Sequence, residues 1–478
     1  MIRILALLFF LNFQLKVISF ATGPVTYYIN TTKGSNSNNG TNAATPWRTI
    51  QRINRQVLLP GDSVLFARGE IFRGHLKANS GIENHRVVYA SYGSGSKPKL
   101  LGSIQRNKTS DWISISKNIW QTTNINFDDN GIDVGNIIFD SENIFGIKVS
   151  RLNKVNKQGV FWSDTANRRV VLYSTANPAK YYSDVELALT RDIIKENYAS
   201  YVTYIDLDLR YGGAHGIGGD STHHITIQDV DISCMGGGYL FGFDLTRYGN
   251  GVEFYNAANN NVVERCRFSQ IYDVAMTSQG DKPWHQVYNL TFRNNIIDKC
   301  EQSFELWLRG GGSSIRDVYF ENNTSTNAGY GMLHPQRPDT NGTFLLFWGF
   351  SDDVTVSDVY IRNNIFSNPK NWGIYWYNSN DISKMRIDNN CWYLQFSPIA
   401  KVREDTHDIY FQPDDYRTKT CQDQHSIFKD PKFKQALFSL SVESPCINAG
   451  ITLERIKDDY TGSLREDGLL DIGAFEYK

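Results

Sequence analysis

The chain of 478 residues has few cysteines for its length. Six are present, at positions 234, 266, 300, 391, 421 and 446, and no two lie at a Cys-x-x-Cys spacing. This count excludes a small disulfide-stabilised scaffold, and the spacing argues against a structural zinc site. The sequence does not choose among the possible cysteine pairings, so these stay open.

An excess of positive charge is also missing. Lys and Arg number 49 against 50 Asp and Glu, for a formal net charge of −1. Nucleic-acid binding and anionic membrane surfaces favour a basic face, so neither is predicted as a partner. We find no Gly-x-Ser-x-Gly elbow, no His-Glu-x-x-His pair and no P-loop, which removes the usual signatures of three other enzyme classes.

Apolar runs long enough to span a bilayer are absent from the chain. The one notable run, in "MIRILALLFFLNFQLKVISFATG", follows an early positive charge and ends in small residues suited to a signal peptidase. We predict a signal peptide over residues 1–21 and a secreted, soluble, monomeric mature protein; a buried N-terminal strand or helix is the alternative. Seven Asn-x-Ser/Thr sequons are compatible with glycosylation.

What the chain does contain is a repeat. The phrases "FRNNII", "FENNTS", "IRNNIF" and "IDNNCW" align with looser copies, and their equivalent positions are 227, 263, 292, 320, 361 and 387. The intervals of 26–41 residues and the alternating apolar residues predict a solenoid of short strands, with a β-sandwich as the alternative. In a parallel β-helix the Asn pair would form a corner, and Asn295, Asn323, Asn364 and Asn390 would stack as a ladder with Cys266 one coil earlier.

The chain resembles the secreted, right-handed parallel β-helix proteins of the pectate-lyase-like group. The opening "YYINTTKGSNSNNGTNAATPWRTIQRIN" and the ending "SPCINAG…DDYTG…REDGLLDIGAFEY" carry this resemblance together with "RYGNGVEFYNAANNNVVERCRFSQIYDVAM". It implies an all-β, right-handed parallel β-helix that acts on carbohydrate. The predicted parts are entry coils at 22–110, a small antiparallel β insertion at 111–188, the main β-helix with its groove at 189–430 and a closing segment at 431–478.

Three acids are the candidate catalytic residues. Aligning Gly251-Val252-Glu253, Val274-Ala275-Met276, Ser303-Phe304-Glu305 and Gly331-Met332-Leu333 sends Glu253 and Glu305 outward on one column with Met276 between them. Two coils correspond to about 9.6 Å between backbones, near the separation in inverting glycosidases. Asp273 enters the intervening strand, where pairing with either Glu would be closer to the retaining distance. The alternatives are solvated surface glutamates and an aspartate that caps a turn.

Long inserts beside these strands supply candidate substrate-binding groups. The predicted substrate-binding residues are His215, Arg247, Tyr248, Trp284, His285, Trp307, Arg309, His334 and Arg337. No cofactor is required for a glycoside hydrolase, which is the favoured function, acting on a polysaccharide or oligosaccharide. A polysaccharide lyase is the first alternative, with a base among the basic residues and Ca²⁺ held by acids such as Asp244 and Asp273. A non-catalytic glycan-binding solenoid is the second.

Overall fold

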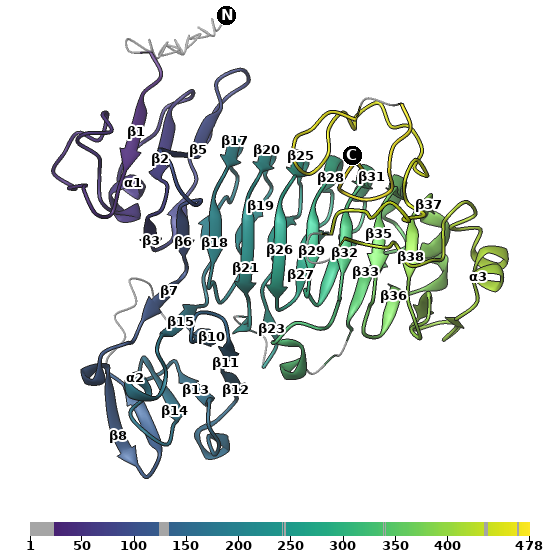
Figure 1. Cartoon of the computed structure of the whole chain (residues 1–478). Helices are drawn as coiled ribbons and strands as arrows, with labels where there is room; N and C mark the ends of the chain where they lie inside the picture. The colour runs from purple at the N-terminus through teal and green to yellow at the C-terminus, as the bar shows by residue number, and fades with distance from the viewer. Residues whose placement is uncertain are drawn as a thin grey trace, which may run out of the picture.

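The computed structural model describes residues 23–123, 133–240, 242, 245–337, 339, 341–434, 438–465 and 468–478. The predicted signal peptide, residues 1–21, lies outside this part of the chain. Three long sheets of parallel strands wind around a common core, and Figure 1 shows their strands stacked side by side from the N-terminal to the C-terminal coils. The predicted parallel β-helix is therefore confirmed.

We name the three sheets A, B and C, in the order in which each coil visits them. Sheet A contains β1 (Thr26–Ile29), β2 (Ser63–Ala67), β5 (Val87–Tyr92), β17 (Ser200–Ile205), β20 (His223–Gln228), β25 (Asn259–Glu264), β28 (Gln286–Arg293), β31 (Ser314–Glu321), β34 (Thr355–Arg362) and β37 (Met385–Asp388). Sheet B contains β3 (Ile71–Arg73), β6 (Lys99–Leu101), β18 (Asp208–Arg210), β21 (Asp231–Met235), β26 (Arg267–Ile271), β29 (Ile296–Asp298), β32 (Thr324–Thr326), β35 (Ile365–Ser367) and β38 (Cys391–Tyr393). Sheet C contains β4 (Leu76–Lys77), β16 (Ile194–Lys195), β19 (Ile217–Asp220), β24 (Val252–Tyr255), β27 (Val274–Gly280), β30 (Gln302–Leu308), β33 (Thr343–Phe350), β36 (Trp372–Trp376), β39 (Ala400–Val402) and β40 (Ile409–Tyr410), the last antiparallel to β39.

The repeat identified in the sequence is the register of sheet A. Phe292 pairs with Val263 on one side and Phe320 on the other, and Phe320 pairs in turn with Ile361. Because successive strand residues point to opposite faces, these apolar residues all point into the solenoid, where they are fully buried. Aromatic rings pack along the interior: Phe292 lies tilted against Phe304 at 5.1 Å between ring centroids, and Phe347 stacks on Trp376 at 4.3 Å.

The two asparagines of each pair have different roles. The first of each pair takes a left-handed backbone, as in Asn322 with φ 51° and Asn363 with φ 55°, and so turns the corner. The second builds the predicted ladder: Asn323 donates its amide to the Asn364 carbonyl oxygen at 3.1 Å and accepts from the Asn295 amide at 3.0 Å. Cys266 continues the ladder one coil earlier, its backbone N–H donating to Asn295 at 2.9 Å.

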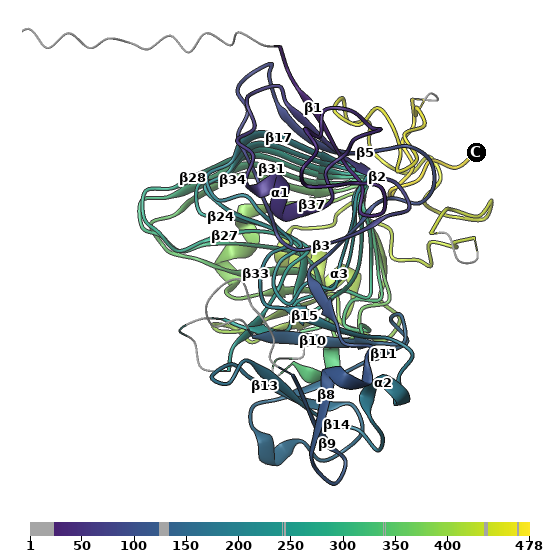
Figure 2. The same ribbon diagram turned by 90° about the vertical axis from the view of Figure 1, so that its left-hand side faces the viewer.

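The insertion forms two antiparallel-rich sheets with their own apolar core, below the first coils in Figures 1 and 2. Antiparallel pairing begins at β7, earlier than the predicted boundary at residue 111. Among the described strands of the insertion, β12 and β13 are the pair that runs parallel. Its strands are β7 (Ser103–Gln105), β8 (Trp112–Ser116), β9 (Ile119–Thr122), β10 (Val134–Phe139), β11 (Ile144–Phe145), β12 (Ile147–Val149), β13 (Val160–Asp164), β14 (Arg169–Tyr173) and β15 (Val185–Leu189). Fully buried Lys148 joins it to the coils, since its ammonium pairs with Asp133 and lies 3.9 Å from the Tyr239 ring centre.

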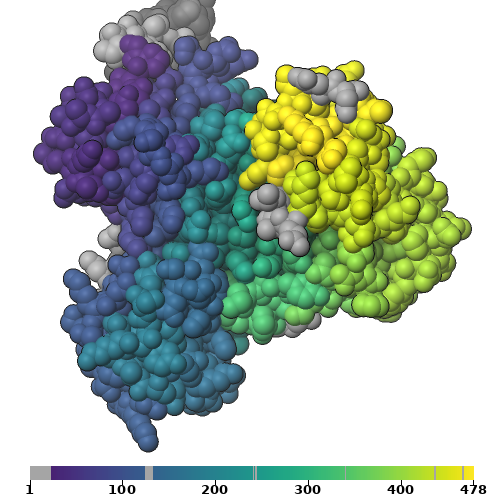
Figure 3. Space-filling model, in the orientation of Figure 1, coloured from purple at the N-terminus to yellow at the C-terminus, as the bar shows by residue number. Residues whose placement is uncertain are grey.

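The C-terminal segment, after α3, packs along the side of the coils, where Figure 3 shows it in yellow in front of them. The corner asparagines hold it there: Asn322 donates its amide to the Asp471 carbonyl at 3.0 Å, and Asn363 donates to that of Ile451 at 2.8 Å. The helices are short. They are α1 (Ile50–Asn54), α2 (Pro178–Tyr181), α3 (Pro413–Thr420) and the 3₁₀ turns Thr109–Asp111, Leu152–Lys154, His334–Gln336 and Ser379–Lys384. In the described part of the chain, no helix is both long and apolar enough to pass through a membrane.

One acidic side chain lies inside the solenoid and makes stability depend on pH. Glu196 follows β16, is almost fully buried, and has the Tyr204 hydroxyl beside it. Burial raises the pKa of Glu196 from 4.5 to about 8, so the folded state binds a proton that the unfolded state releases between these values. The stability that this proton supports is complete below pH 4.5 and is lost as the pH rises through 8.

We therefore expect Glu196→Gln to gain stability over the native chain as pH rises, because glutamine carries no titrating proton. The midpoint of urea unfolding, measured at pH 5 and pH 8, should differ more between the two proteins at the higher pH. The exposed Glu83→Gln serves as the matched control. A difference that is the same at both pH values would contradict the assignment of this pH dependence to Glu196.

Candidate active site

Sheet C presents two rows of side chains on its outer face. In the first row Glu253 pairs with Thr277, and Thr277 with Glu305. The predicted placement of Glu253 and Glu305 on one column, two coils apart, is thus correct. The residue between them is Thr277, however, and the predicted Met276 points into the solenoid beside Phe304. Ala275 and Met276 are both apolar, so alternation in the sequence did not fix which one faces inward.

The predicted fourth strand of this column, Gly331-Met332-Leu333, is wrong. These residues lie in the turn before the 3₁₀ segment, and Met332 is 46% exposed. The residue opposite Glu305 is Leu346 of β33, thirteen positions after the predicted Leu333, because the insert between the coils is longer. In the second outer row Tyr255 pairs with Gln279 and Gln279 with Trp307.

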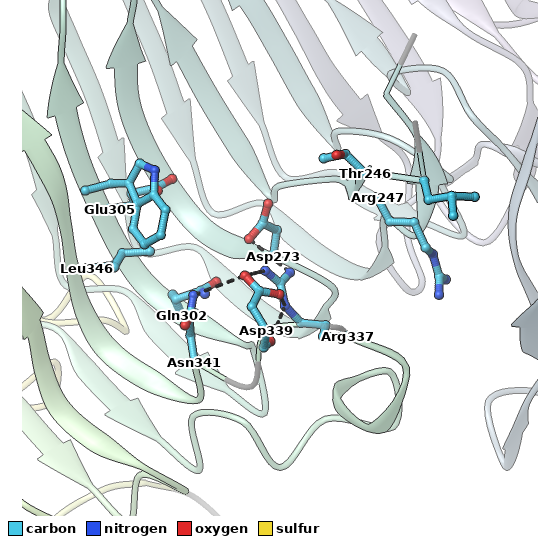
Figure 4. A pocket seen from close by; sticks show the side chains of 11 residues that line it. Thr246, Arg247, Asp273, Gln302, Glu305, Arg337, Asp339, Asn341 and Leu346 are labelled. Carbon is cyan, nitrogen blue, oxygen red and sulfur yellow. Dashed lines mark hydrogen bonds and ion pairs between the residues drawn. The ribbon is translucent and has the colours of Figure 1, made fainter. Parts of the chain in front are cut away.

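Two chambers open along this face and meet at Asp273. The first has a volume of about 530 Å³ and includes Glu305, Arg337, Asp339 and Trp348 in its lining (Figure 4). The second, of about 540 Å³, includes Glu253, His215 and Trp307. Asp273 lines both. The outer face of sheet C therefore carries two chambers that share Asp273, with the three candidate acids along them, and we call the two together the groove.

The Glu305 carboxyl lies in an environment that disfavours its negative charge. Its side chain is buried, and its carboxylate oxygen accepts a long hydrogen bond of 3.4 Å from the Thr277 hydroxyl. Burial and then the negative charges of Asp273 and Glu253 raise the pKa of Glu305 well above its usual value. This environment favours the protonated form of the carboxyl group over the charged one.

Glu253 has the opposite environment. Its carboxylate accepts from His215 Nε2 at 2.5 Å and from the Gln279 amide. Burial acts to raise the pKa of Glu253, but His215 and then Gln279 outweigh it, and the net shift is downward. The Asn250 backbone N–H donates to His215 Nδ1 at 3.1 Å, which leaves the Nε2 proton directed at Glu253.

Asp273 is held by Arg337. The Arg337 guanidinium donates to Asp273 at 3.1 Å and to Asp339 at 3.0 Å (Figure 4). It also donates to the Tyr272 carbonyl at 2.7 Å. Burial raises the pKa of Asp273, Arg337 opposes this, and Asp339 and Glu301 add to the rise. Thr277 lies opposite Glu305, and Asp273 comes four residues before Thr277 in the chain. Asp273 and Glu305 are therefore separated along the strand direction as well as by one coil. The predicted retaining distance between them does not follow from this placement.

Glu301 and Asp339 belong to the site and were missed from the sequence. Glu301 accepts from His334 Nδ1 at 2.6 Å and from the Gly342 backbone N–H at 2.8 Å, and its carboxylate lies 3.8 Å from Arg337. Because Val274 pairs with Gln302, Glu301 occupies the position of Asp273 one coil later. Asp273 directly precedes β27, and Glu301 directly precedes β30 on the next coil. This repetition of an acid at one position was the signal in the sequence that could have revealed Glu301. Asp339 lies in the insert and follows no repeat.

The other predicted binding residues divide into two groups. Tyr248 and Trp307 line the Glu253 chamber; the Tyr248 ring lies 5.1 Å from that of His215, and Trp307 donates to Gln279 at 2.9 Å. Arg247 lines the Glu305 chamber, but its guanidinium donates to the Gly237 carbonyl at 2.7 Å and to Gln336 at 3.2 Å. His334 is buried against Glu301.

Three further predicted residues lie outside the lining of both chambers. Trp284 is 79% exposed, and the backbone N–H of His285 donates to Ser313 at 2.9 Å. The guanidinium of Arg309 lies 5.4 Å from the Trp307 ring centre, at the edge of the groove. Asp244, considered above as a calcium ligand, lies outside the described residues.

Comparison with known proteins supports the fold. No protein-family model matches the chain. A lacto-N-biosidase of Bifidobacterium longum is 30% identical over 92 residues, which are 18% of this chain and only 6% of that protein's length. A solved structure titled glycoside hydrolase has a TM-score of 0.51 and 10% identity, over 81% of this chain and 90% of its own. A pectate lyase structure has a TM-score of 0.46 and 14% identity, over 96% and 97%. These neighbours are parallel β-helix, carbohydrate-active proteins.

Proposed function

We propose that this chain is a secreted glycoside hydrolase that cleaves a polysaccharide or oligosaccharide in the groove of sheet C. One observation carries the proposal: Glu253 and Glu305 share an outer row, two coils apart, and their environments shift their pKa values in opposite directions. Carboxyl groups shifted apart in this way are suited to act as a base and an acid. The glycan-acting neighbours and the predicted signal peptide support the proposal.

In the proposed reaction Glu305 is the general acid. It donates its proton to the glycosidic oxygen as the bond to the leaving sugar breaks. Glu253 is the general base, which takes a proton from a water molecule as the water attacks the anomeric carbon from the opposite face. Two coils correspond to about 9.6 Å between backbones, close to the roughly 6.5–9.5 Å between carboxyl groups in inverting enzymes and well above the roughly 5–5.5 Å in retaining ones. We therefore propose inversion of the anomeric configuration.

Asp273 and Arg337 act at the junction of the two chambers. Asp273 lines both, so it can contact the sugar on either side of the cleaved bond. Its negative charge is also the second cause of the raised pKa of Glu305, after burial. Arg337 fixes the Asp273 carboxylate through the bond at 3.1 Å. Asp273 therefore has a binding role and also helps to raise the pKa of the acid.

The contacts of the two arginines favour hydrolysis over elimination. A lyase needs a cation directed at the carboxylate of a uronate, and a base for the proton beside it. Arg337 is engaged by Asp273, Asp339 and the Tyr272 carbonyl, and Arg247 by Gln336 and the Gly237 carbonyl. Both arginines line the Glu305 chamber, but their guanidinium groups are held by these protein partners.

The test is to incubate the purified protein with neutral, uronate-containing and sulfated polysaccharides, and to follow new reducing ends and ultraviolet absorbance together. Hydrolysis produces reducing ends without absorbance, whereas β-elimination also creates a double bond that absorbs. A parallel rise of both signals would overturn the proposal in favour of a lyase. Absence of both on a broad panel, while a glycan is bound, would favour the binding function.

We expect His215→Ala to lose activity at the acidic end of the pH range in which the native protein is active. Removing the ring takes away the partner that lowers the pKa of Glu253, so the base becomes protonated at higher pH. The acidic limb of the kcat/KM profile should move to higher pH while the alkaline limb, set by Glu305, stays in place. The control is His425→Ala, which removes an exposed His–Asp388 pair at 2.7 Å. An unchanged acidic limb would exclude Glu253 as the base.

A further inference from the structure

The outer rows of sheet C change character beyond Glu305. In the first row Leu346 pairs with Tyr375, and Tyr375 with Lys401. The second row continues from Trp307 to later coils, where the Tyr377 backbone N–H donates to the Phe347 carbonyl at 2.9 Å. Six side chains on these coils form a surface that we call the aromatic–cation surface: Arg309, Trp348, Tyr375, Tyr377, Lys401 and Arg403.

The cations of this surface lie over its rings. The Arg403 guanidinium is 4.9 Å from the Trp348 ring centre and 5.4 Å from that of Tyr377. The Lys401 ammonium is 5.8 Å from the Tyr375 ring centre, and the Arg309 guanidinium is 5.5 Å from that of Tyr377. Cation–π contacts hold the charges in place. They also cover ring faces on which an uncharged sugar would otherwise stack.

Most of this positive charge is not neutralised by the protein. Across the described ranges, neither Arg309 nor Lys401 forms an ion pair, and Arg403 pairs with Glu404 at 2.8 Å. The Arg309 guanidinium donates to the Trp348 carbonyl at 2.6 Å, which orients it without cancelling its charge. The other end of the groove is acidic, since Asp192, Asp220 and Asp281 line the Glu253 chamber.

The surface is continuous with the proposed catalytic groove. Trp348 lines the same chamber as Glu305, and Arg403 and Arg309 both contact Trp348. Lys401 stands three coils beyond Glu305 in the same row, a distance of about 14 Å along the stack. A glycan chain that follows the groove past Glu305 therefore reaches these cations.

We propose that the aromatic–cation surface is a subsite for an anionic group, a carboxylate or a sulfate, on a sugar of the same glycan chain that is cleaved at Glu305. The inference rests on the proposed function, because it places the substrate in that groove. Guanidinium and ammonium groups that lack a carboxylate partner bind such anions through charge-assisted hydrogen bonds. The acidic Glu253 chamber, in contrast, takes an uncharged sugar. The substrate class is thus a glycan that contains both sugars with an anionic group and uncharged sugars.

The test measures binding of oligosaccharides of equal length that are neutral, uronate-containing or sulfated to the Glu305→Gln protein by titration calorimetry. Adding Lys401→Gln and Arg403→Gln should weaken binding of the anionic ligands roughly tenfold and leave neutral ligands unaffected. The control adds Arg316→Gln and Arg386→Gln instead, which removes cations lying 4.6 Å and 5.7 Å from the Tyr288 and Tyr360 rings of sheet A.

Each outcome decides the matter. Selective loss of uronate binding or of sulfate binding supports the subsite and identifies its anion. Neutral ligands that bind as tightly as anionic ones, or equal weakening by the control variant, would overturn it. If the native protein releases reducing ends from purely neutral glycans alone, the subsite is overturned and the hydrolase proposal stands. If anion binding is selective but the product absorbs in the ultraviolet, the hydrolase proposal falls and the subsite stands.

Discussion

Glu305→Gln should reduce turnover of the natural glycan by roughly 10²–10⁴-fold, the usual contribution of a general acid. Glutamine has nearly the shape of a protonated glutamic acid, so the buried side chain and its contact with Thr277 can persist. It cannot donate the proton that the leaving oxygen needs. Because the variant removes a buried titrating group, we expect the folded state to be at least as stable as the native one.

A substrate whose leaving group is an acidic phenol distinguishes whether Glu305 acts as the general acid or only supports the structure of the site. Such a leaving group departs without protonation, so Glu305→Gln should retain much of its activity on it while losing activity on the natural linkage. The exposed Glu443→Gln is the control for handling and folding. Equal losses on both substrates would remove Glu305 from the role of general acid, and unchanged turnover of the natural glycan would remove it from the mechanism.

Asn323→Ala should destabilise the fold by about 3–5 kcal/mol. The substitution removes hydrogen bonds to the Phe292 carbonyl at 2.9 Å, to the Asn295 backbone N–H at 3.0 Å and to the amides on either side. All of these groups are buried, so water cannot replace the lost partners. Asn323 itself does not have a left-handed backbone, so the cost comes from unsatisfied polar groups and not from strain.

Urea unfolding followed by circular dichroism measures this effect. Because a solenoid can unfold in parts, the first transition is the one to compare. The control is Asn39→Ala, which removes an exposed amide that accepts one hydrogen bond, at 3.2 Å from the Thr41 N–H. We expect that control to lie within about 0.5 kcal/mol of the native protein. If Asn323→Ala lowered the free energy of unfolding by no more than this control does, the asparagine ladder would not stabilise the coils.

The repeat made the fold predictable, because residues at the same position of successive repeats pair with one another in neighbouring coils. Val263, Phe292, Phe320, Ile361 and Ile387 pair in the predicted order. The separate role of the first asparagine in each pair could not be read in this way. Its bond to the C-terminal segment joins residues about 150 positions apart, as with Asn322 and Asp471, and no repeat relates the two.

The site was predictable only where it follows the repeat. Glu253 and Glu305 were placed correctly on one column because alternation and coil spacing determine their positions. The partner beyond Glu305 was misassigned because a long insert precedes β33. The residue between the two acids was misassigned because Ala275 and Met276 are both apolar. Asp339, which binds Arg337, lies in such an insert, where no periodicity operates.

The most direct measurement of the central claim is proton NMR of the reaction in D₂O, with the anomeric region followed from the first turnovers. The account predicts that the first new reducing sugar has the anomeric configuration opposite to that of the cleaved linkage, and equilibrates afterwards, because Glu305 and Glu253 act on opposite faces across two coils. First product of the same configuration would contradict the inverting pair. An olefinic proton signal would show that the product is an unsaturated sugar formed by elimination, and this would contradict hydrolysis itself.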